Sequence, residues 1–343
     1  MGSADARRNH SPLEVGRLDE EGWSPMNWRI KSRIQRYCDA VPGGGGIYAG
    51  LQRAVGRHRR PDYGERLDLA CRTIAGLAEA GVAIEGASVM EVGTGYAPTI
   101  PVLFWLAGAS RVETFDLNRY LRPRLAAGML GWIADRAELV ESRLAGLVDP
   151  DALRRRLATL DQLQDRPLAF LKRANIAYHA PADAAATGLA DGSIDVHFSA
   201  YVMEHVPPVV IEALLREASR VLRPGGVAAH RIDPTDHFAH ADPTISTVHF
   251  LRFDEESWRR IGGNRFAYHN RLRDDDYRRL FLESPLHLVR HRFEVDSRAV
   301  SDLRNGFPLA PPYRGRDPED LARCRLDYIA RKPGSPSPAP SAG

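Results

Sequence analysis

Residues 89–98 read VMEVGTGYAP, a stretch that passes from apolar residues into two glycines. An apolar run ends at Val92, Gly93 and Gly95 follow with one residue between them, and Glu91 stands two positions before the first glycine. The next residues, TIPVLFWLAG, are apolar enough to form a buried helix. A strand, a glycine turn and a helix in this order are typical of a parallel α/β sheet, in which glycine lets a ligand approach the backbone closely.

Strands and helices alternate on the C-terminal side of this stretch. The expected strands are residues 88–92, 112–117, 176–180, 193–200, 227–232, 286–295 and 324–332. The expected helices include residues 97–107, 120–134 and 208–222, and RPGG at 223–226 is expected to be a turn. This order predicts an α/β fold, namely a Rossmann-like, doubly wound and mostly parallel sheet of seven strands.

The parts outside this sheet suggest a division into domains. Before the first strand, apolar residues recur at helical spacing up to Gly81, which predicts a helical N-terminal extension. A Pro/Ser/Gly-rich tail is expected to be disordered because it cannot bury apolar surface. The expected parts are the extension at 1–84, the main domain at 85–332 and the tail at 333–343. Within the main domain we expect a helical insertion at about 137–172 and a lid-like insertion after strand five at about 233–273.

Composition limits the partners and the location. The net charge is only +3 at a sequence pI of about 8.8, whereas a nucleic-acid partner would usually need a clustered basic face. Three scattered cysteines suit buried free thiols. The N-terminus lacks the apolar core of a secretory signal, and the apolar run at 97–108 is far shorter than the roughly 20 residues of a membrane span. We therefore expect a cytoplasmic protein with no nucleic-acid or membrane partner; its oligomeric state stays open.

Two cofactor classes share the glycine pattern after the first strand. A dinucleotide site would place a third glycine at position 98, where this chain has Pro98, and Glu91 would repel a pyrophosphate. A sulfonium cofactor, which carries positive charge, would tolerate that acid. Asp116 follows Gly95 by roughly 20 residues, the spacing at which a carboxylate accepts hydrogen bonds from ribose hydroxyls in either class. The residues favour a sulfonium cofactor and leave a nicotinamide cofactor as the alternative.

Five motifs in order, EVGTGYA, FDLN, APADA, IDVHFSAYVMEHV and LRPGG, resemble those of the class I S-adenosylmethionine-dependent methyltransferases, in the group that acts mostly on small molecules. The likeness covers about residues 84–232, and it departs from many relatives at Ala97 and Pro98. It implies that the acid and glycines after strand one line the methionine side of the cofactor, Asp116 holds the ribose and Asp183 approaches the adenine. The implied cofactor residues are Glu91, Gly93, Thr94, Gly95, Asp116, Leu117, Asn118, Ala182, Asp183, Ser199 and Ala200.

Methyl transfer depends mainly on positioning, and a general base helps when the acceptor is a hydroxyl group. Histidines follow strands four and five, and histidine accepts protons near neutral pH. We expect His205 to be the base, or else His237 assisted by Asp233. A metal site formed by His237, His240 and Asp242 is the alternative to base catalysis. Their spacing matches no specific metal site, so no metal is expected.

The expected function is methyl transfer from S-adenosylmethionine to a small-molecule acceptor, most plausibly at a hydroxyl oxygen, with nitrogen and carbon open. Residues 23–56, with four glycines at 43–46, and 237–271 are expected to form a mobile cover over the acceptor pocket. Residues 199–202 read SAYV, unlike the Asp/Asn-Pro-Pro-aromatic run of amino-methylating nucleic-acid enzymes. The alternatives are a nicotinamide-dependent oxidoreductase and a non-catalytic cofactor-binding scaffold.

Overall fold

A computed structural model describes residues 26–42, 47, 62–264 and 266–334, and these residues form two compact units. The larger unit comprises residues 62–232, 277–290 and 327–334. The smaller unit comprises the described residues before position 60, together with residues 233–276 and 291–326. The four glycines at 43–46, Trp23, Tyr48 and the tail from residue 335 lie outside the described residues.

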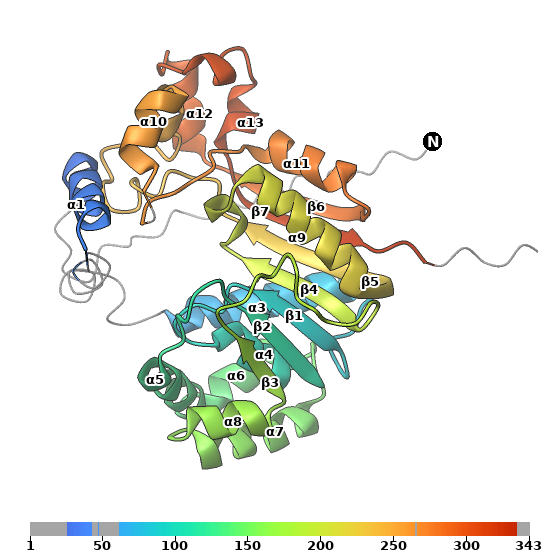
Figure 1. The fold of residues 1–343 in the computed structure, drawn as a ribbon. Coiled ribbons are helices and arrows are strands. Elements are labelled where there is room, and N and C mark those ends of the chain that lie inside the picture. The colour runs from blue at the N-terminus through green and yellow to red at the C-terminus, as the bar shows by residue number, and fades with distance from the viewer. Residues whose placement is uncertain (1–25, 43–46, 48–61, 265, 335–343) are drawn as a thin grey trace, which may run out of the picture. The chain divides into compact units, whose positions relative to one another are not determined.

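The central sheet has seven strands in the order β3-β2-β1-β4-β5-β7-β6 (Figure 1). The strands are β1 (Ser88–Val92), β2 (Arg111–Phe115), β3 (Ile176–His179), β4 (Ile194–Ala200), β5 (Leu222–Ile232), β6 (His287–Val295) and β7 (Arg323–Arg331). Adjacent strands from β3 to β5 pair in parallel. The predicted Rossmann-like α/β fold is thus confirmed. The strand order reverses between β1 and β4, which is where open α/β sheets bind ligands.

Most helices of the larger unit pack on one face of this sheet. They are α3 (Tyr63–Glu79), α4 (Thr99–Leu106), α5 (Pro123–Ala134), α6 (Ala137–Leu144), α7 (Pro150–Leu163) and α8 (Pro167–Arg173). Their apolar residues share a core with alternate strand residues, among them Val89, Val112 and Val196, because successive side chains of a strand point to opposite faces. Helix α9 (Pro208–Val221) packs against β5, in front of which Figure 1 draws it. Helices α6, α7 and α8 follow one another between α5 and β3.

The RPGG segment corrects one prediction, because it belongs to β5 and is not a turn between α9 and that strand. Ile194 pairs with Leu222 and Val196 pairs with Val227, so β5 bulges between these pairs. Gly225 adopts a φ of +80°, and its amide donates to the Lys332 carbonyl at 3.0 Å. The glycine therefore permits a bulge that stays hydrogen-bonded to the chain after β7.

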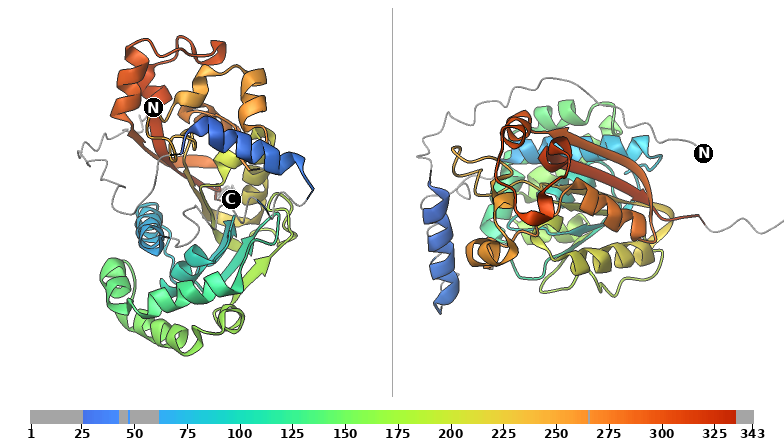
Figure 2. Two further views of the ribbon diagram at one scale, coloured as in Figure 1. Left: turned by 90° about the vertical axis from the view of Figure 1, so that its left-hand side faces the viewer. Right: turned by 90° about the horizontal axis from the view of Figure 1, so that it is seen from above.

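The smaller unit has a hydrophobic core of its own. Its helices are α1 (Trp28–Ala40), η3 (His249–Arg252), α10 (Glu255–Gly262), α12 (Ser297–Arg304), η4 (Pro311–Tyr313) and α13 (Pro318–Ala322). Trp28, Phe250 and Trp258 are buried together with apolar residues of α12 and α13. Figures 1 and 2 show α12 and α13, coloured red, side by side. Trp28, Phe250 and Trp258 belong to the segments 23–56 and 237–271, and their side chains pack in this core.

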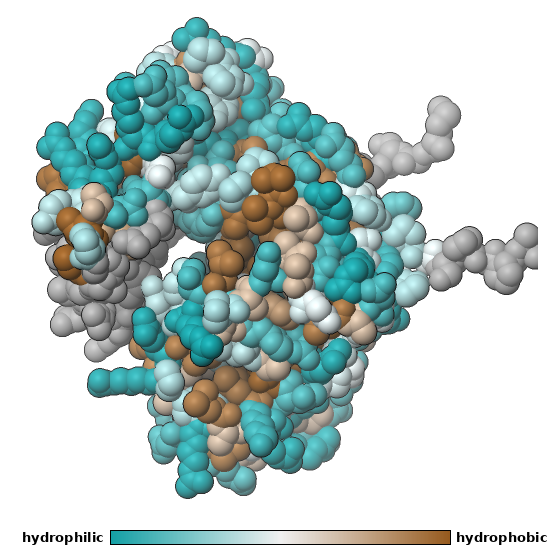
Figure 3. All heavy atoms as spheres, in the orientation of Figure 1, coloured by the Kyte–Doolittle hydropathy of each residue, from teal (hydrophilic) through white to brown (hydrophobic). Residues whose placement is uncertain are grey.

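Helix α11 (Asp274–Glu283) begins in the smaller unit and continues into the larger one. None of the helices in the described ranges combines the length and the apolar character that a membrane crossing requires. The face drawn in Figure 3 is mostly hydrophilic, with apolar residues exposed between polar ones. Leu117 is the most exposed large apolar side chain of the described residues, at 72%.

Candidate cofactor and active site

The loop after β1 is shaped by its two glycines. Gly93 has a φ of +89° and Gly95 a φ of +71°, a region that side chains larger than glycine rarely adopt. The Gly93 amide donates to the Phe115 carbonyl at 2.8 Å, which ties the loop to the end of β2. A Cβ atom at Gly93 would lie 2.5 Å from Cγ2 of Val202, whereas one at Gly95 would meet no atom within 4 Å. Gly93 therefore serves a close approach of two chain segments, and Gly95 serves the backbone conformation.

Asp116 joins this loop to the ends of β2 and β3. Its Oδ2 accepts hydrogen bonds from the Gly95 amide at 3.1 Å and from the Tyr178 hydroxyl at 3.1 Å. Burial raises the pKa of Asp116 to about 6, against the lowering effect of these hydrogen bonds. The sequence analysis did not identify Tyr178 as a partner of Asp116. Its position in the strand that pairs with β2, where Tyr178 lies opposite Thr114, could have indicated this contact.

Glu91 lies at the buried start of the same loop. Its side chain is 3% exposed, and its Oε2 accepts a hydrogen bond of 2.6 Å from the Thr114 hydroxyl. The Thr114 and Thr94 hydroxyls are also hydrogen-bonded to each other. Burial raises the pKa of Glu91 to about 7. Glu91, Thr114 and Thr94 thus form a polar chain that runs from the sheet into the glycine loop.

The remaining predicted cofactor residues differ in exposure. Leu117 and Asn118 are exposed next to the buried Asp116. The side-chain amide (Nδ2) of Asn118 donates to the Tyr120 hydroxyl at 3.2 Å. The Ala182 amide donates to the Asp116 carbonyl at 2.9 Å, so the loop after β3 meets the end of β2. Asp183 is exposed, and its Oδ1 accepts a hydrogen bond of 2.8 Å from the Ala185 amide.

The end of β4 contains one buried and one strained residue. Ser199 is 1% exposed and its hydroxyl is 2.7 Å from Nδ1 of His230 on β5, whereas Ala200 is partly exposed. Tyr201 follows with a φ of +60°, which is rare for a bulky side chain and marks positions held by their surroundings. The Arg66 guanidinium lies 5.5 Å from the centre of the Tyr201 ring. Tyr201 is a second residue that sequence reasoning did not single out.

Comparison with known proteins identifies one segment of the chain by its family. Residues 153–230, from within α7 to within β5, match the family model described as a methyltransferase domain. The chain carries a methyltransferase domain. This match and the fold indicate an S-adenosylmethionine-dependent methyltransferase, whose cofactor is S-adenosylmethionine. No curated protein matches the sequence significantly.

Three solved structures are similar to this methyltransferase over most of its length. A protein from Galdieria sulphuraria, provisionally assigned as a sarcosine dimethylglycine methyltransferase, has 16% identity and a TM-score of 0.44, covering 77% of this chain and 85% of its own. S-adenosylmethionine-dependent methyltransferases from Methanosarcina mazei and Mesorhizobium loti have 13% and 15% identity and TM-scores of 0.41 and 0.40. They cover 73% and 75% of this chain and 94% and 96% of their own chains.

The three residues considered for base catalysis are divided between the two units of the methyltransferase. His205 is exposed at the end of η2 (Met203–His205), shortly after β4 in the larger unit. Asp233 and His237 lie in the smaller unit, with Oδ2 and Nε2 3.6 Å apart. His230 is buried, and its burial lowers its pKa well below the usual value, so it supports Ser199 as a neutral side chain.

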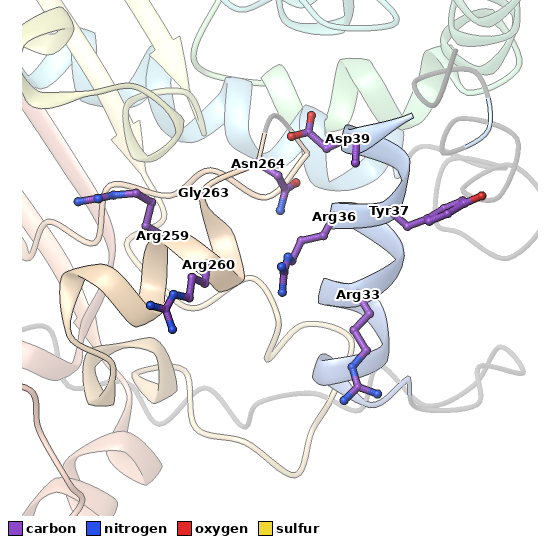
Figure 4. A pocket seen from close by; sticks show the side chains of 9 residues that line it. Arg33, Arg36, Tyr37, Asp39, Arg259, Arg260, Gly263 and Asn264 are labelled. Carbon is purple, nitrogen blue, oxygen red and sulfur yellow. The ribbon is translucent and has the colours of Figure 1, made fainter. Parts of the chain in front are cut away.

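A pocket of about 540 Å³ lies between α1 and α10 in the smaller unit of the methyltransferase (Figure 4). Arg36 extends from α1 toward α10, whereas Tyr37 points away from it in the same view. No residue predicted to bind the cofactor lines this pocket. The lining residues are Arg33, Arg36, Tyr37, Asp39, Ala40, Arg259, Arg260, Gly263 and Asn264.

Proposed function

We propose that this methyltransferase binds S-adenosylmethionine over the carboxyl ends of β1, β2 and β3 and transfers its methyl group to a hydroxyl oxygen of a small molecule. The observation that supports this site best is the contact of the Gly95 amide with the Asp116 carboxylate, beside the exposed Leu117. The carboxylate has acceptor positions for ribose hydroxyls, and an exposed apolar side chain beside it offers a surface for an adenine ring.

Asp116→Ala tests the cofactor site. Hydrogen bonds to a charged group are worth about 1.5–3 kcal/mol, so S-adenosylhomocysteine should bind roughly 10- to 150-fold more weakly to the variant in calorimetry. Tyr178→Phe removes one partner of Asp116 and keeps the carboxylate, so its loss should be smaller. Asp165→Ala, at an exposed position after α7, is the control. Unchanged affinity in Asp116→Ala would show that the ribose binds elsewhere.

Ligand-induced stabilisation distinguishes the cofactor class. S-adenosylmethionine and its demethylated product should raise the melting temperature of the protein, because a ligand that binds only the native state stabilises it. NAD should leave the melting temperature unchanged. A shift with NAD and none with S-adenosylhomocysteine would restore the oxidoreductase alternative.

We further propose His205 as the base, because an exposed imidazole shortly after β4 suits proton removal from a hydroxyl acceptor. A screen of metabolites with methyl-labelled cofactor would first identify an acceptor. His205→Ala should then lower turnover by roughly 10²- to 10⁴-fold with unchanged affinity for S-adenosylhomocysteine. His287→Ala, at an exposed position on β6, is the control. Full turnover in His205→Ala would leave methyl transfer dependent on positioning alone.

His237 with Asp233 is the second base proposed from the sequence. Loss of turnover in His237→Ala with retained cofactor affinity would support it. The short distances from Asp233 to His237 and to His240 also suit metal binding, which is argued below and is measured by metal affinity instead of turnover.

A further inference from the structure

Three potential metal ligands converge in the turn that follows β5. Asp233, His237 and His240 each offer one ligand atom, and these atoms all lie within 4.8 Å of one another. Oδ2 of Asp233 is 3.6 Å from Nε2 of His237 and 3.6 Å from Nε2 of His240. All three residues belong to the smaller unit, so their arrangement is internal to one compact body.

Local hydrogen bonds fold the backbone so that these side chains meet. Oδ1 of Asp233 accepts from the Thr235 amide at 3.1 Å, and Oδ1 of Asp236 accepts from the Phe238 amide at 2.8 Å. Aspartate side chains that bond the backbone two residues on are typical of tight turns. Two such turns in succession bring the side chains at positions 233, 237 and 240 to one side.

The two nitrogen–oxygen distances of 3.6 Å are close to those between two ligands of one metal ion. Ligands at about 2.1 Å from a tetrahedral zinc ion are separated from each other by roughly 3.4 Å. Small side-chain movements would therefore place an ion between Oδ2 and the two imidazoles.

The carboxylate is also prepared for this role. Oδ1 of Asp233 accepts a hydrogen bond of 2.6 Å from the Thr235 hydroxyl, which orients the group with Oδ2 toward the histidines. The His237 and His240 side chains are 30% and 41% exposed, whereas Nε2 of His237 is itself buried.

We propose that Asp233, His237 and His240 bind a divalent transition-metal ion, zinc in the first place, with its remaining coordination position open. Two imidazoles and one carboxylate are a ligand set of zinc sites that keep a position free for water or substrate. Thr235 is the positioning residue that holds the carboxylate. It also lies 3.2 Å from Nε2 of His240, a contact that the metal would replace.

The sequence hypothesis of a metal site chose a different carboxylate. Asp242 accepts hydrogen bonds from the Trp28 amide at 2.9 Å and from the Thr244 amide at 3.1 Å, so it holds α1 and the next turn in place. Asp233 occupies the position beside the histidines instead. Spacing along the chain could not distinguish the two acids.

Calorimetry with the full-length, tag-free protein tests the proposal without reference to methyl transfer. After chelator treatment, titration with Zn²⁺ should show one ion per chain. The substitutions Asp233→Asn, His237→Gln and His240→Gln should each weaken this binding on the order of 100-fold or more, and Thr235→Val by about 10- to 100-fold. His287→Gln, an exposed histidine of the larger unit, should bind as the wild type does.

Cobalt substitution provides a second measurement that needs no variant. The Co²⁺ protein should show the visible absorption of a four- or five-coordinate ion, and X-ray absorption of the Zn²⁺ protein should show two imidazole ligands. Wild-type binding weaker than a Kd of about 10 μM would overturn the proposal. So would unchanged affinity in all four variants, or a six-coordinate cobalt spectrum. Circular dichroism of each variant separates lost ligands from lost folding.

Discussion

At the scale of single residues, burial changes the ionisation of Glu91. An ionised carboxylate in an apolar environment is costly, and here burial outweighs the hydrogen bond from Thr114, so the pKa rises to about 7. The protonated form is therefore favoured in the native ligand-free protein at mildly acidic pH. In the unfolded chain the same side chain ionises near its ordinary pKa of 4.5.

This difference predicts a pH-dependent stability. Because the native pKa is raised, the contribution of Glu91 is complete below about pH 4.5 and is lost as the pH rises to about 7, by up to about 3 kcal/mol. Glu91→Gln cannot titrate, so its free energy of unfolding should fall less over this interval. The measurement is urea unfolding of both ligand-free proteins from pH 4.5 to 7.5.

Glu138→Gln, at an exposed position in the first turn of α6, is the matched control. It should follow the wild type, since its carboxylate is exposed to water in both states. Identical pH profiles for the wild type and Glu91→Gln would show that Glu91 is ionised throughout, against the burial argument.

At the scale of elements, the two glycines in the loop between β1 and α4 have different roles. Both Gly93 and Gly95 have positive φ, which costs a larger residue about 1–2 kcal/mol. Only Gly93 also faces a side chain, Val202, at a distance that a Cβ atom could not tolerate. The two positions therefore differ in packing and not in backbone conformation.

Alanine at these positions should have unequal effects. Gly93→Ala should lower the melting temperature and the affinity for S-adenosylhomocysteine more than Gly95→Ala, because it adds a clash to the same backbone strain. Adding Val202→Ala should restore part of the loss in Gly93→Ala. Gly146→Ala is the control for strain alone, since Gly146 has a φ of +75° and no atom within 4 Å of a Cβ. Equal losses in both loop variants, with no rescue, would contradict the packing argument.

At the scale of the whole molecule, Arg273 connects distant parts of the smaller unit. Its side chain is 1% exposed, and its guanidinium donates to the carbonyls of Leu321 at 2.6 Å and Arg323 at 2.9 Å, and to that of Pro234. A planar, permanently charged fork with several donors can satisfy all three carbonyls at once. Arg273 thus joins the segment after β5 to α13 and the start of β7.

Arg273→Met should therefore destabilise the protein by about 3 kcal/mol or more, because buried carbonyls would lose charged donors. The measurement is urea unfolding, with Arg278→Met at an exposed position of α11 as the control. Affinity for S-adenosylhomocysteine at low denaturant should be retained, since the proposed cofactor residues lie in the larger unit. A loss of stability no greater than that of Arg278→Met would show that the carbonyls find other donors.

Much of the fold could be predicted because its signals are local. The strand at 88–92 is found as β1 at the predicted bounds, since a short apolar run followed by glycines has few other solutions. The helix after Pro208 likewise begins where proline and an apolar stripe indicated. The RPGG segment was misjudged because its glycines suit a turn and a bulge equally, and only pairing with Lys332 decides between them.

The site residues, too, divide into those indicated by local sequence and those that depend on tertiary contacts. The strand ends, and the acids and glycines located there, could be predicted from the sequence, because they depend on periodicity and on backbone preferences over a few residues. The folded chain was needed to show that Tyr178 donates to Asp116 across 62 residues, and that Asp233 rather than Asp242 lies beside the histidines. Those partnerships arise from strand pairing, turn closure and burial, which fix distances that spacing along a chain does not contain.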